Sequence, residues 1–517
     1  MKNGSSLWRK KWEYKQKKKH ISLEMSEENP QDQMLEVSKE IQYNNAKMWQ
    51  LALFSLNNAA TNLYLALMGY VTYYANGIVG LGVFLLSMIL TGMRVFDGIT
   101  DPIIGYLLDK TEGRYGKFRP FLCIGNLLLA SSCIVLYLTN HLVPQYIRLP
   151  YFIFVYAIYI IGYTFQTVVA KSGQTIITNN PRQRPIATYF DSMFIMAAYG
   201  GTTLYVSNYL IPKYHTFLNP DLFREFVFMI VIVSMICTIL AVIGIWEKDQ
   251  KQFYGIARGE KIHKSDYLEI LKCNKPIRML TLASCSNQFV AIVYSHTTVG
   301  VMLYGILMHN YSIAGLIGIV AAAPTLLVVN IGIKIAQRFG QRRALILAAL
   351  FAVIFQVWMI VILLFGKIDT ISFVPRKING ITVWFVLVFS LLNGCKSIIN
   401  NMVVPMIADC SDYELMRSGK YVPGLMGALF SFVEKAVSAF GTAFVGIVLT
   451  FIGYGKVLPQ VGEPVTNTLR WSTIFLFCIV PIVGWLFTLL AMHFYELDKK
   501  TMQKVYLFRA QQGNKQT

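Results

Sequence analysis

The sequence predicts an all-α membrane protein whose twelve transmembrane helices form two six-helix bundles, and three observations support that prediction. Hydrophobic residues make up 55% of the 517 residues and charged residues only 14%, whereas a soluble domain carries about 25% charged residues. Apolar runs long enough to cross a bilayer recur along the chain. A short basic motif occurs once in each half of the sequence. The same composition excludes a disordered chain and a disulfide-rich secreted scaffold.

The predicted spans follow one another from residue 49 to residue 496. A bilayer core requires about 20 apolar residues in a helix. Such runs cover residues 49–75, 81–108, 118–140, 150–176, 186–211, 224–246, 277–307, 312–336, 342–366, 380–405, 421–453 and 469–496. The chain therefore divides into an N-terminal tail (1–48), a first bundle (49–246), a connector (247–276), a second bundle (277–496) and a C-terminal tail (497–517).

The formal net charge of +20 lies mostly in the tails and in alternate connections between the spans. Positively charged loops stay on the cytoplasmic side of a membrane, so both termini are predicted to be cytoplasmic in a multi-pass protein of the plasma membrane. The basic loops are expected to contact anionic lipid headgroups. This distribution does not favour nucleic acid as a partner, and the chain is expected to function as a monomer.

The repeated motif reads R-[YF]-G-x-x-R. It follows the second predicted span as RYGKFR and the eighth as RFGQRR. Two copies at equivalent places indicate two related halves, although two ordinary basic loops remain the alternative. Glycine permits a tight turn, and arginine can cap helix C-termini and bind headgroups. The motif residues predicted to form a cytoplasmic gate are Arg114, Gly116, Lys117, Arg119, Arg338, Gly340 and Arg342.

The second predicted span contains three charged residues, Arg94, Asp97 and Asp101. An ionised side chain at the bilayer centre costs about 2.5–3.5 kcal/mol, so it requires a partner or a function. The spacing places all three on one helix face. The two carboxylates can therefore converge on Na⁺ or share a proton, with Arg94 keeping them ionised. The alternative is a structural ion pair between Arg94 and Asp97, with Asp101 ending the helix.

Three lysines, Lys171, Lys396 and Lys435, fall in the middle of predicted spans rather than at their ends. Each can snorkel to the interface if the span boundaries shift, and Lys396 is the hardest to explain in that way. The many aromatic residues are interpreted as packing and interfacial belts. Because the sequence holds no Walker loop, HExxH or Gly-x-Ser-x-Gly motif, an enzyme is not predicted. Transport would then depend on an ion or solute gradient.

Two blocks of the sequence resemble a known family. The segments RVFDGITDP (94–102) and RYGKFRP (114–120), and the later block ADCSDYE (408–414) followed by Lys435, are similar to the signature of the glycoside–pentoside–hexuronide:cation symporters. The resemblance runs from about residue 50 to 495. It implies the major facilitator fold and cation-coupled solute uptake, with no cofactor and with Na⁺ or H⁺ as the coupling ion.

The resemblance also implies a cation site. Asp97 and Asp101 match the two carboxylates of the family's cation site, where Na⁺ is one possible ion, and Arg94 and Lys435 match residues close to that site. A third carboxylate of the family is replaced here by Thr167. Asp409 and Asp412, which lie in the later block, are expected at the cytoplasmic gate.

The sugar site implied by the resemblance is altered. The family's sugar-binding aspartate and arginine fall at Asn58 and Ser192, with Asn62 one turn from the first and Asp191 beside the second. We predict substrate binding by these four residues together with Lys171 and Lys396.

The balance of charge leads to a hypothesis about coupling. Lys171 lies one turn after Thr167 and can partly replace a metal cation near the two aspartates, which favours H⁺ coupling or exchange over Na⁺ dependence. Spare positive charge would suit an acidic solute such as a uronide. The alternative has Lys171 at the interface and the Thr167 hydroxyl as a cation ligand.

The predicted function is secondary active import of a sugar-like solute by alternating access, with H⁺ or Na⁺ as the coupling ion. One alternative is a carrier of a lipid-like solute. Another is a sensor or scaffold that kept the fold and lost transport.

Overall fold

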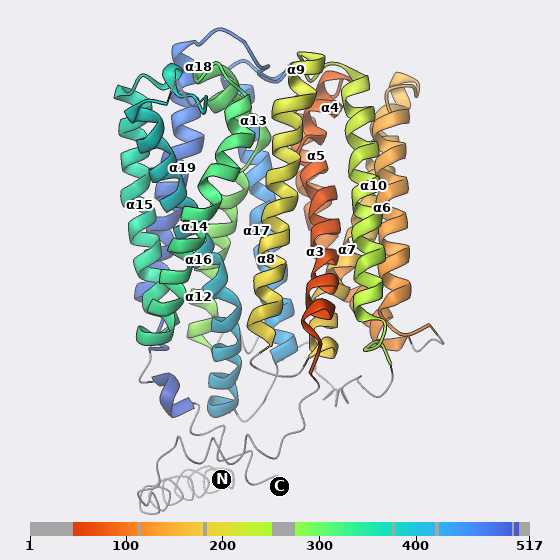
Figure 1. Ribbon diagram of the computed structural model, residues 1–517, viewed down its shortest axis with the longest axis vertical. Helices are drawn as coiled ribbons and strands as arrows, with labels where there is room; N and C mark the ends of the chain where they lie inside the picture. The colour runs from red at the N-terminus through yellow and green to blue at the C-terminus, as the bar shows by residue number, and fades with distance from the viewer. Residues whose placement is uncertain are drawn as a thin grey trace, which may run out of the picture.

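The structure is a computed structural model that describes residues 45–111, 115–178, 183–250, 274–374, 378–418, 423–498 and 501–505. Within these ranges it consists of helices joined by short connections, without strands. The long helices run side by side, and the two halves of the chain lie next to each other as one bundle (Figure 1).

The first half begins with α3 (Met48–Met68), which continues as α4 (Val71–Gly77). It goes on through α5 (Val83–Lys110), α6 (Arg119–Thr139) and α7 (Gln145–Ile177). The next helix is α8 (Arg184–Tyr205), which a π-helical turn, η1 (Val206–Leu210), joins to α9 (Ile211–Tyr214). The half ends with α10 (Pro220–Ile245).

The second half begins with α12 (Lys275–Tyr294), α13 (Thr297–Gly300) and the π-helical η3 (Val301–Leu307). The following helices are α14 (Ser312–Phe339), α15 (Gln341–Phe365), the short η4 (Ile368–Thr370), α16 (Gly380–Ser418) and α17 (Pro423–Phe451). The last span combines α18 (Asn467–Ile474), η6 (Phe475–Ile479) and α19 (Val480–His493).

Nine helices of the described ranges are long and apolar enough to cross a membrane, or ten if the pair Lys275–Tyr294 and Thr297–Leu307, bent by 52°, is one span. The predicted total of twelve also includes α3–α4 and α8–α9, which run the height of the bundle in Figure 1. Polar residues such as Asn57 and Asn62 in α3 and Asp191 in α8 make these two helices less apolar.

Two helices depart from the predicted spans. The span predicted at 277–307 is interrupted at Ser295 and His296, where the His296 Nδ1 accepts a hydrogen bond from the Thr298 backbone N–H at 3.3 Å and caps α13. The span predicted to end at 405 continues as helix to Ser418. Hydropathy detects only the lipid-embedded part of a helix, so this polar extension is not visible to it.

The halves are joined at one end of the bundle, which we call the Asn76 end. The Asn76 side chain donates to the Lys456 carbonyl at 2.9 Å and accepts from the Leu458 N–H at 3.0 Å. The Tyr73 hydroxyl donates to the Pro459 carbonyl at 2.9 Å. These contacts connect α4 to the loop that follows α17. The opposite end, which carries the turn at Gly116, is called the Gly116 end.

Candidate functional site: a central cavity with a cross-half ion pair

A cavity of about 710 Å³ lies between the two halves, within the range of about 300–1,000 Å³ typical of small-molecule sites. Its walls come from α3, α5, α7 and α8 of the first half and from α12, η3, α14, α16 and α17 of the second. The charged residues that line it are Arg94, Asp97, Lys396, Glu434 and Lys435. The cavity therefore combines contributions from both halves with groups that are costly to place in a membrane.

One ammonium joins the two aspartates that the sequence singled out. The Lys435 Nζ lies 2.6 Å from Asp101 Oδ2 and 2.9 Å from Asp97 Oδ2. The aspartates lie one turn apart on α5, whereas Lys435 lies on α17, so the ion pair links the halves. The Asp97 side chain is 3% exposed and that of Lys435 22%. Lys435 thus occupies the position between the carboxylates that a coupling cation would require.

A threonine hydroxyl approaches the same cluster, and it belongs to Thr164. Its Oγ1 lies 3.3 Å from Asp97 Oδ1 and 3.0 Å from Thr100 Oγ1. Thr167, the residue proposed from the sequence, lies one turn further along α7 and donates to the Thr164 carbonyl at 3.2 Å. The carboxylate and hydroxyl oxygens are the hard ligands that Na⁺ or a proton requires. A sodium ion would fit them only if Lys435 moved away.

Arg94 lines the cavity together with the α7 residues Tyr156 and Tyr163. It forms no ion pair with Asp97 within 4 Å, so the structural pair considered from the sequence is not present. The charge of Asp97 nevertheless acts on Arg94 over a longer distance.

The residues predicted to bind substrate are distributed unevenly. Lys396 lines the cavity, with its Nζ 3.6 Å from the centroid of the Tyr294 ring. Asn58 and Asn62 instead form a local contact, in which the Asn62 side chain donates to the Asn58 carbonyl at 2.7 Å. The part of α3 that lines the cavity is its last turn, and residues 69–72, which lead into α4, continue this lining nearer the Asn76 end.

The predicted residues of α8 also lie outside this lining. Asp191 is buried and Ser192 is exposed, whereas α8 contributes Tyr199 and Thr203 to the cavity. The side chain of Lys171 lies outside the described residues. Among the five predicted substrate residues whose side chains the structure describes, it brings only Lys396 to the cavity wall.

Sequence reasoning missed the tyrosines of the cavity. Eight line it: Tyr70, Tyr156, Tyr159, Tyr163, Tyr199, Tyr294, Tyr304 and Tyr311. The hydroxyl groups of Tyr159 and Tyr294 are buried without a hydrogen-bond partner. Such groups are costly unless a ligand or water satisfies them. The aromatic residues were interpreted as packing because their convergence depends on how the helices are arranged.

The first copy of the basic motif closes onto the connector. Gly116 has φ +89°, and the Asp249 carboxylate accepts hydrogen bonds from the backbone N–H groups of Lys117, Phe118 and Arg119 at 2.9–3.0 Å. A Cβ on Gly116 would lie 2.2 Å from this carboxylate, so only glycine fits. Asp249 was not predicted because it lies in a polar connector. Arg114 lies outside the described residues.

The second copy binds a different partner. Gly340, with φ +93°, joins α14 to α15. The Arg342 guanidinium donates to the carbonyls of Met492 and His493 at 3.1 and 3.2 Å, where α19 ends and cations are stabilised. Arg338 lies against the ring of Phe339. Both copies of the motif therefore turn at a glycine with positive φ, but the first binds Asp249 of the connector and the second binds the end of α19.

The polar extension of α16 carries the acidic residues predicted at the gate. Asp409 is half-buried and Asp412 is buried. Beside them, Glu414 accepts a hydrogen bond from the Asn274 side chain at 2.8 Å. This bond ties α16 to the start of α12, a role that the sequence did not indicate for Glu414.

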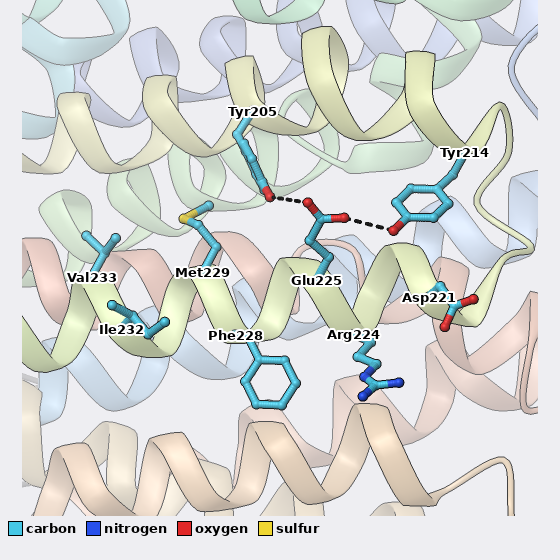
Figure 2. Close-up of a pocket in the computed structure, with 9 residues that line it drawn as sticks. All are labelled: Tyr205, Tyr214, Asp221, Arg224, Glu225, Phe228, Met229, Ile232 and Val233. Carbon is cyan, nitrogen blue, oxygen red and sulfur yellow. Dashed lines mark hydrogen bonds between the residues drawn. The ribbon is translucent and has the colours of Figure 1, made fainter.

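A second pocket, of about 690 Å³, lies on the flank of the first half between α8–α9 and α10 (Figure 2). Figure 2 shows Glu225 reaching toward Tyr205 and Tyr214, whose hydroxyls donate to it at 3.4 and 2.8 Å. The same carboxylate raises the pKa of Lys213 above its usual value through a hydrogen bond. Glu225 is thus satisfied by the pocket's own wall, and the pocket lies away from the interface between the halves.

The fold and the cavity define a membrane transporter built from two halves around a central site. The chain is similar in structure to a D-xylose–proton symporter (TM-score 0.56, 16% identity, covering 85% of this chain and 96% of that one). It is also similar to the nucleoside transporter NupG (TM-score 0.57, 10% identity, 87% and 100% covered). These similarities confirm the predicted major facilitator fold, although they leave the count of twelve spans open.

The chain belongs to the family described as MFS/sugar transport protein, whose sequence profile matches residues 15–499. It is 23% identical to the isoprimeverose transporter of Lactiplantibacillus pentosus, over 86% of this chain and 88% of the relative. It is also 23% identical to the glucuronide carrier protein homolog of Escherichia coli (strain K12), over 87% and 93%. The predicted family is confirmed, and the protein is a transporter and not an enzyme.

Proposed function

We propose that the protein is a symporter that imports a sugar-like, acidic solute by alternating access, coupled to H⁺. The names of the relatives support a sugar-like solute. The observation that carries the coupling is the ion pair in which Lys435 of one half joins Asp97 and Asp101 of the other. Because this ion pair lies at the wall of the cavity, the protonation state of the two aspartates affects how strongly α5 of the first half is held to α17 of the second.

In the proposed cycle, the coupling cation and Lys435 compete for the same carboxylates. A proton that binds to either aspartate neutralises one of the two carboxylates that hold the Lys435 ammonium. The ion pair that links α5 to α17 then becomes weaker. Solute in the cavity contacts both halves and favours the orientation in which they enclose it. Proton and solute together then permit a reorientation that neither favours alone.

Two features support H⁺ over Na⁺. Lys435 already neutralises much of the negative charge that a sodium ion would need, and like charges repel at this distance. Asp101 Oδ1 is buried without a hydrogen-bond partner, so it can accept a proton while Oδ2 keeps its contact with Lys435. We therefore expect Na⁺ to have a small effect on transport.

We place the Gly116 end in the cytoplasm of the cell because the basic loops gather there, and we propose the plasma membrane as the location. The orientation can be tested by labelling single cysteines in the Gly340 turn and in the 309–311 loop with a membrane-impermeant reagent in intact cells. Only the loop cysteine should react.

Uptake into proteoliposomes tests the function. The probe is a radiolabelled aryl glucuronide, supplied with an inward pH gradient in Na⁺-free buffer or with a Na⁺ gradient at constant pH. We expect the pH gradient alone to drive accumulation above the external concentration. Accumulation that required Na⁺ would contradict H⁺ coupling, and the absence of uptake under every gradient would contradict an acidic glycoside as solute.

A further inference from the structure

Lys396 is a second ammonium in the cavity, and its surroundings differ from those of Lys435. It lies 16 residues after the start of α16, so it is roughly 24 Å from that end of the helix. Its side chain is half-buried and lines the cavity. The Nζ lies over the face of Tyr294, 3.6 Å from the ring centroid. A snorkelling lysine would extend toward the interface, whereas this one rests on a ring of the cavity wall.

The carboxylates that line the cavity or lie next to it have partners other than Lys396. Asp97 and Asp101 bind Lys435, and Glu434 accepts a hydrogen bond from Ser284 at 2.8 Å. Ser284 lies ten residues before Tyr294 on α12, which is about 15 Å along the helix. Within the described ranges, Lys396 therefore has no carboxylate within 4 Å.

The ring beneath Lys396 is also incompletely satisfied. Tyr294 is 8% exposed and stacks on Phe477 with a centroid distance of 4.5 Å, so its position is fixed. Its buried hydroxyl has no hydrogen-bond partner. A cation over an aromatic ring is stabilised by the ring's electrons, but this offsets only part of the cost of placing an ammonium within the membrane. The Lys396 ammonium and the Tyr294 hydroxyl are thus adjacent donors, and neither has an anionic or hydrogen-bond acceptor among the described residues.

Arg94 is another cation of the cavity, without a carboxylate within 4 Å among the described residues, and it is less suited to bind an anion. It is on the opposite half, and the charge of Asp97 acts on it. An added carboxylate near Arg94 would also meet the repulsion of that aspartate. Lys396 has no such acidic neighbour in the part of the chain that the structure describes.

We propose that Lys396 and Tyr294 form the subsite for the carboxylate of the solute, and that Lys396 determines the preference for acidic over neutral glycosides. This inference rests on the proposed function. The ammonium supplies a charge-assisted hydrogen bond, and the Tyr294 hydroxyl donates a second. A neutral solute would leave the Lys396 charge unpaired in the occluded cavity, and sites of this kind discriminate strongly against such analogues.

The test compares a matched pair of probes, 4-nitrophenyl glucuronide and 4-nitrophenyl glucoside, which differ in whether carbon 6 is a carboxylate. Binding to the purified full-length protein is measured by calorimetry for the wild type and for Lys396→Met, Lys396→Gln and Lys396→Arg. The control is Lys334→Gln, which removes an exposed lysine of α14 outside the cavity.

We expect Lys396→Met to weaken binding of the glucuronide at least tenfold while binding of the glucoside is unchanged or stronger. Lys396→Arg should restore part of the affinity, and Lys334→Gln should match the wild type. Equal losses for both probes in the Met and Gln variants, or no loss for the glucuronide, would overturn the assignment. A wild type that binds neither probe would instead refute the proposed function.

Discussion

Substitution of Lys435 by glutamine exposes the cation site directly. In the wild type the ammonium contacts Asp101 Oδ2 at 2.6 Å and Asp97 Oδ2 at 2.9 Å. Lys435→Gln removes the positive charge and leaves both carboxylates, of which Asp97 lines the cavity, without their ammonium partner. We expect the variant to bind a cation in its place and to become more stable when that cation is supplied.

The distances set the size of the effect. Because both oxygens contact the same nitrogen, at 2.6 and 2.9 Å, they lie at most about 5.5 Å apart. At an effective dielectric constant of about 20, two unit charges at this separation repel by at least about 3 kcal/mol. Relief of this repulsion strengthens cation binding by roughly two orders of magnitude. A cation present at about 100 times its dissociation constant then stabilises the folded protein by about 2.7 kcal/mol.

Thermal unfolding of the purified protein measures this effect. The unfolding temperature of Lys435→Gln should rise with Na⁺ at alkaline pH and with falling pH in Na⁺-free buffer, by more than that of the wild type. Lys396→Gln is the matched control, since it removes a cavity lysine without a carboxylate partner. An unfolding temperature of Lys435→Gln that responds to Na⁺ and pH as the wild type does would refute the reasoning.

Three further predictions concern the Asn76 end, where contacts between the halves keep the cavity closed, and the stability of the fold. Asn76→Ala removes two hydrogen bonds between the halves and should weaken closure by about 1–3 kcal/mol, so that a cysteine introduced into the cavity reacts faster with reagents from that end. Gly315→Ala places a Cβ 2.5 Å from the Leu204 Cα; this overpacking costs about 1–3 kcal/mol and should reduce the closed population in spectroscopic distance measurements across the same end. Partial burial, and then the charge of Arg148, lower the pKa of His141 below 6.5. Neutral His141 therefore contributes stability above that pH, and this contribution is lost as the pH falls through the lowered pKa. His141→Gln should abolish this pH dependence in unfolding measurements between pH 5 and 8.

Much of the fold could be predicted from the sequence because the membrane imposes a simple rule. A segment that crosses a bilayer must form all its backbone hydrogen bonds within a helix and present apolar side chains to lipid, so it is recognisable in the sequence as a long apolar run. The rule fails where a helix departs from that environment. The break at His296 arises from a side-chain cap, which leaves the run apolar, so hydropathy does not reveal it. The extension of α16 past residue 405 is polar, so hydropathy does not identify it as helix.

The candidate site was only partly predictable. Asp97 and Asp101 could be placed together because they share a helix, and charged residues are rare in a membrane. The partner of these carboxylates, Lys435, lies 334 residues from Asp101 in the sequence, and the family resemblance supplied it. Thr164 and Tyr294 carry no charge, so only the packing of α7 and α12 against their neighbours reveals their position in the cavity.

The most direct test of the account is proton movement that accompanies solute uptake by the wild type and by Asp97→Asn in proteoliposomes. The account predicts that the wild type acidifies the lumen as solute enters and accumulates it under an inward pH gradient. It predicts that Asp97→Asn still exchanges solute across the membrane but neither moves protons nor accumulates solute. Proton movement and accumulation in Asp97→Asn equal to those of the wild type would contradict the claim that these buried carboxylates couple the cation to the solute.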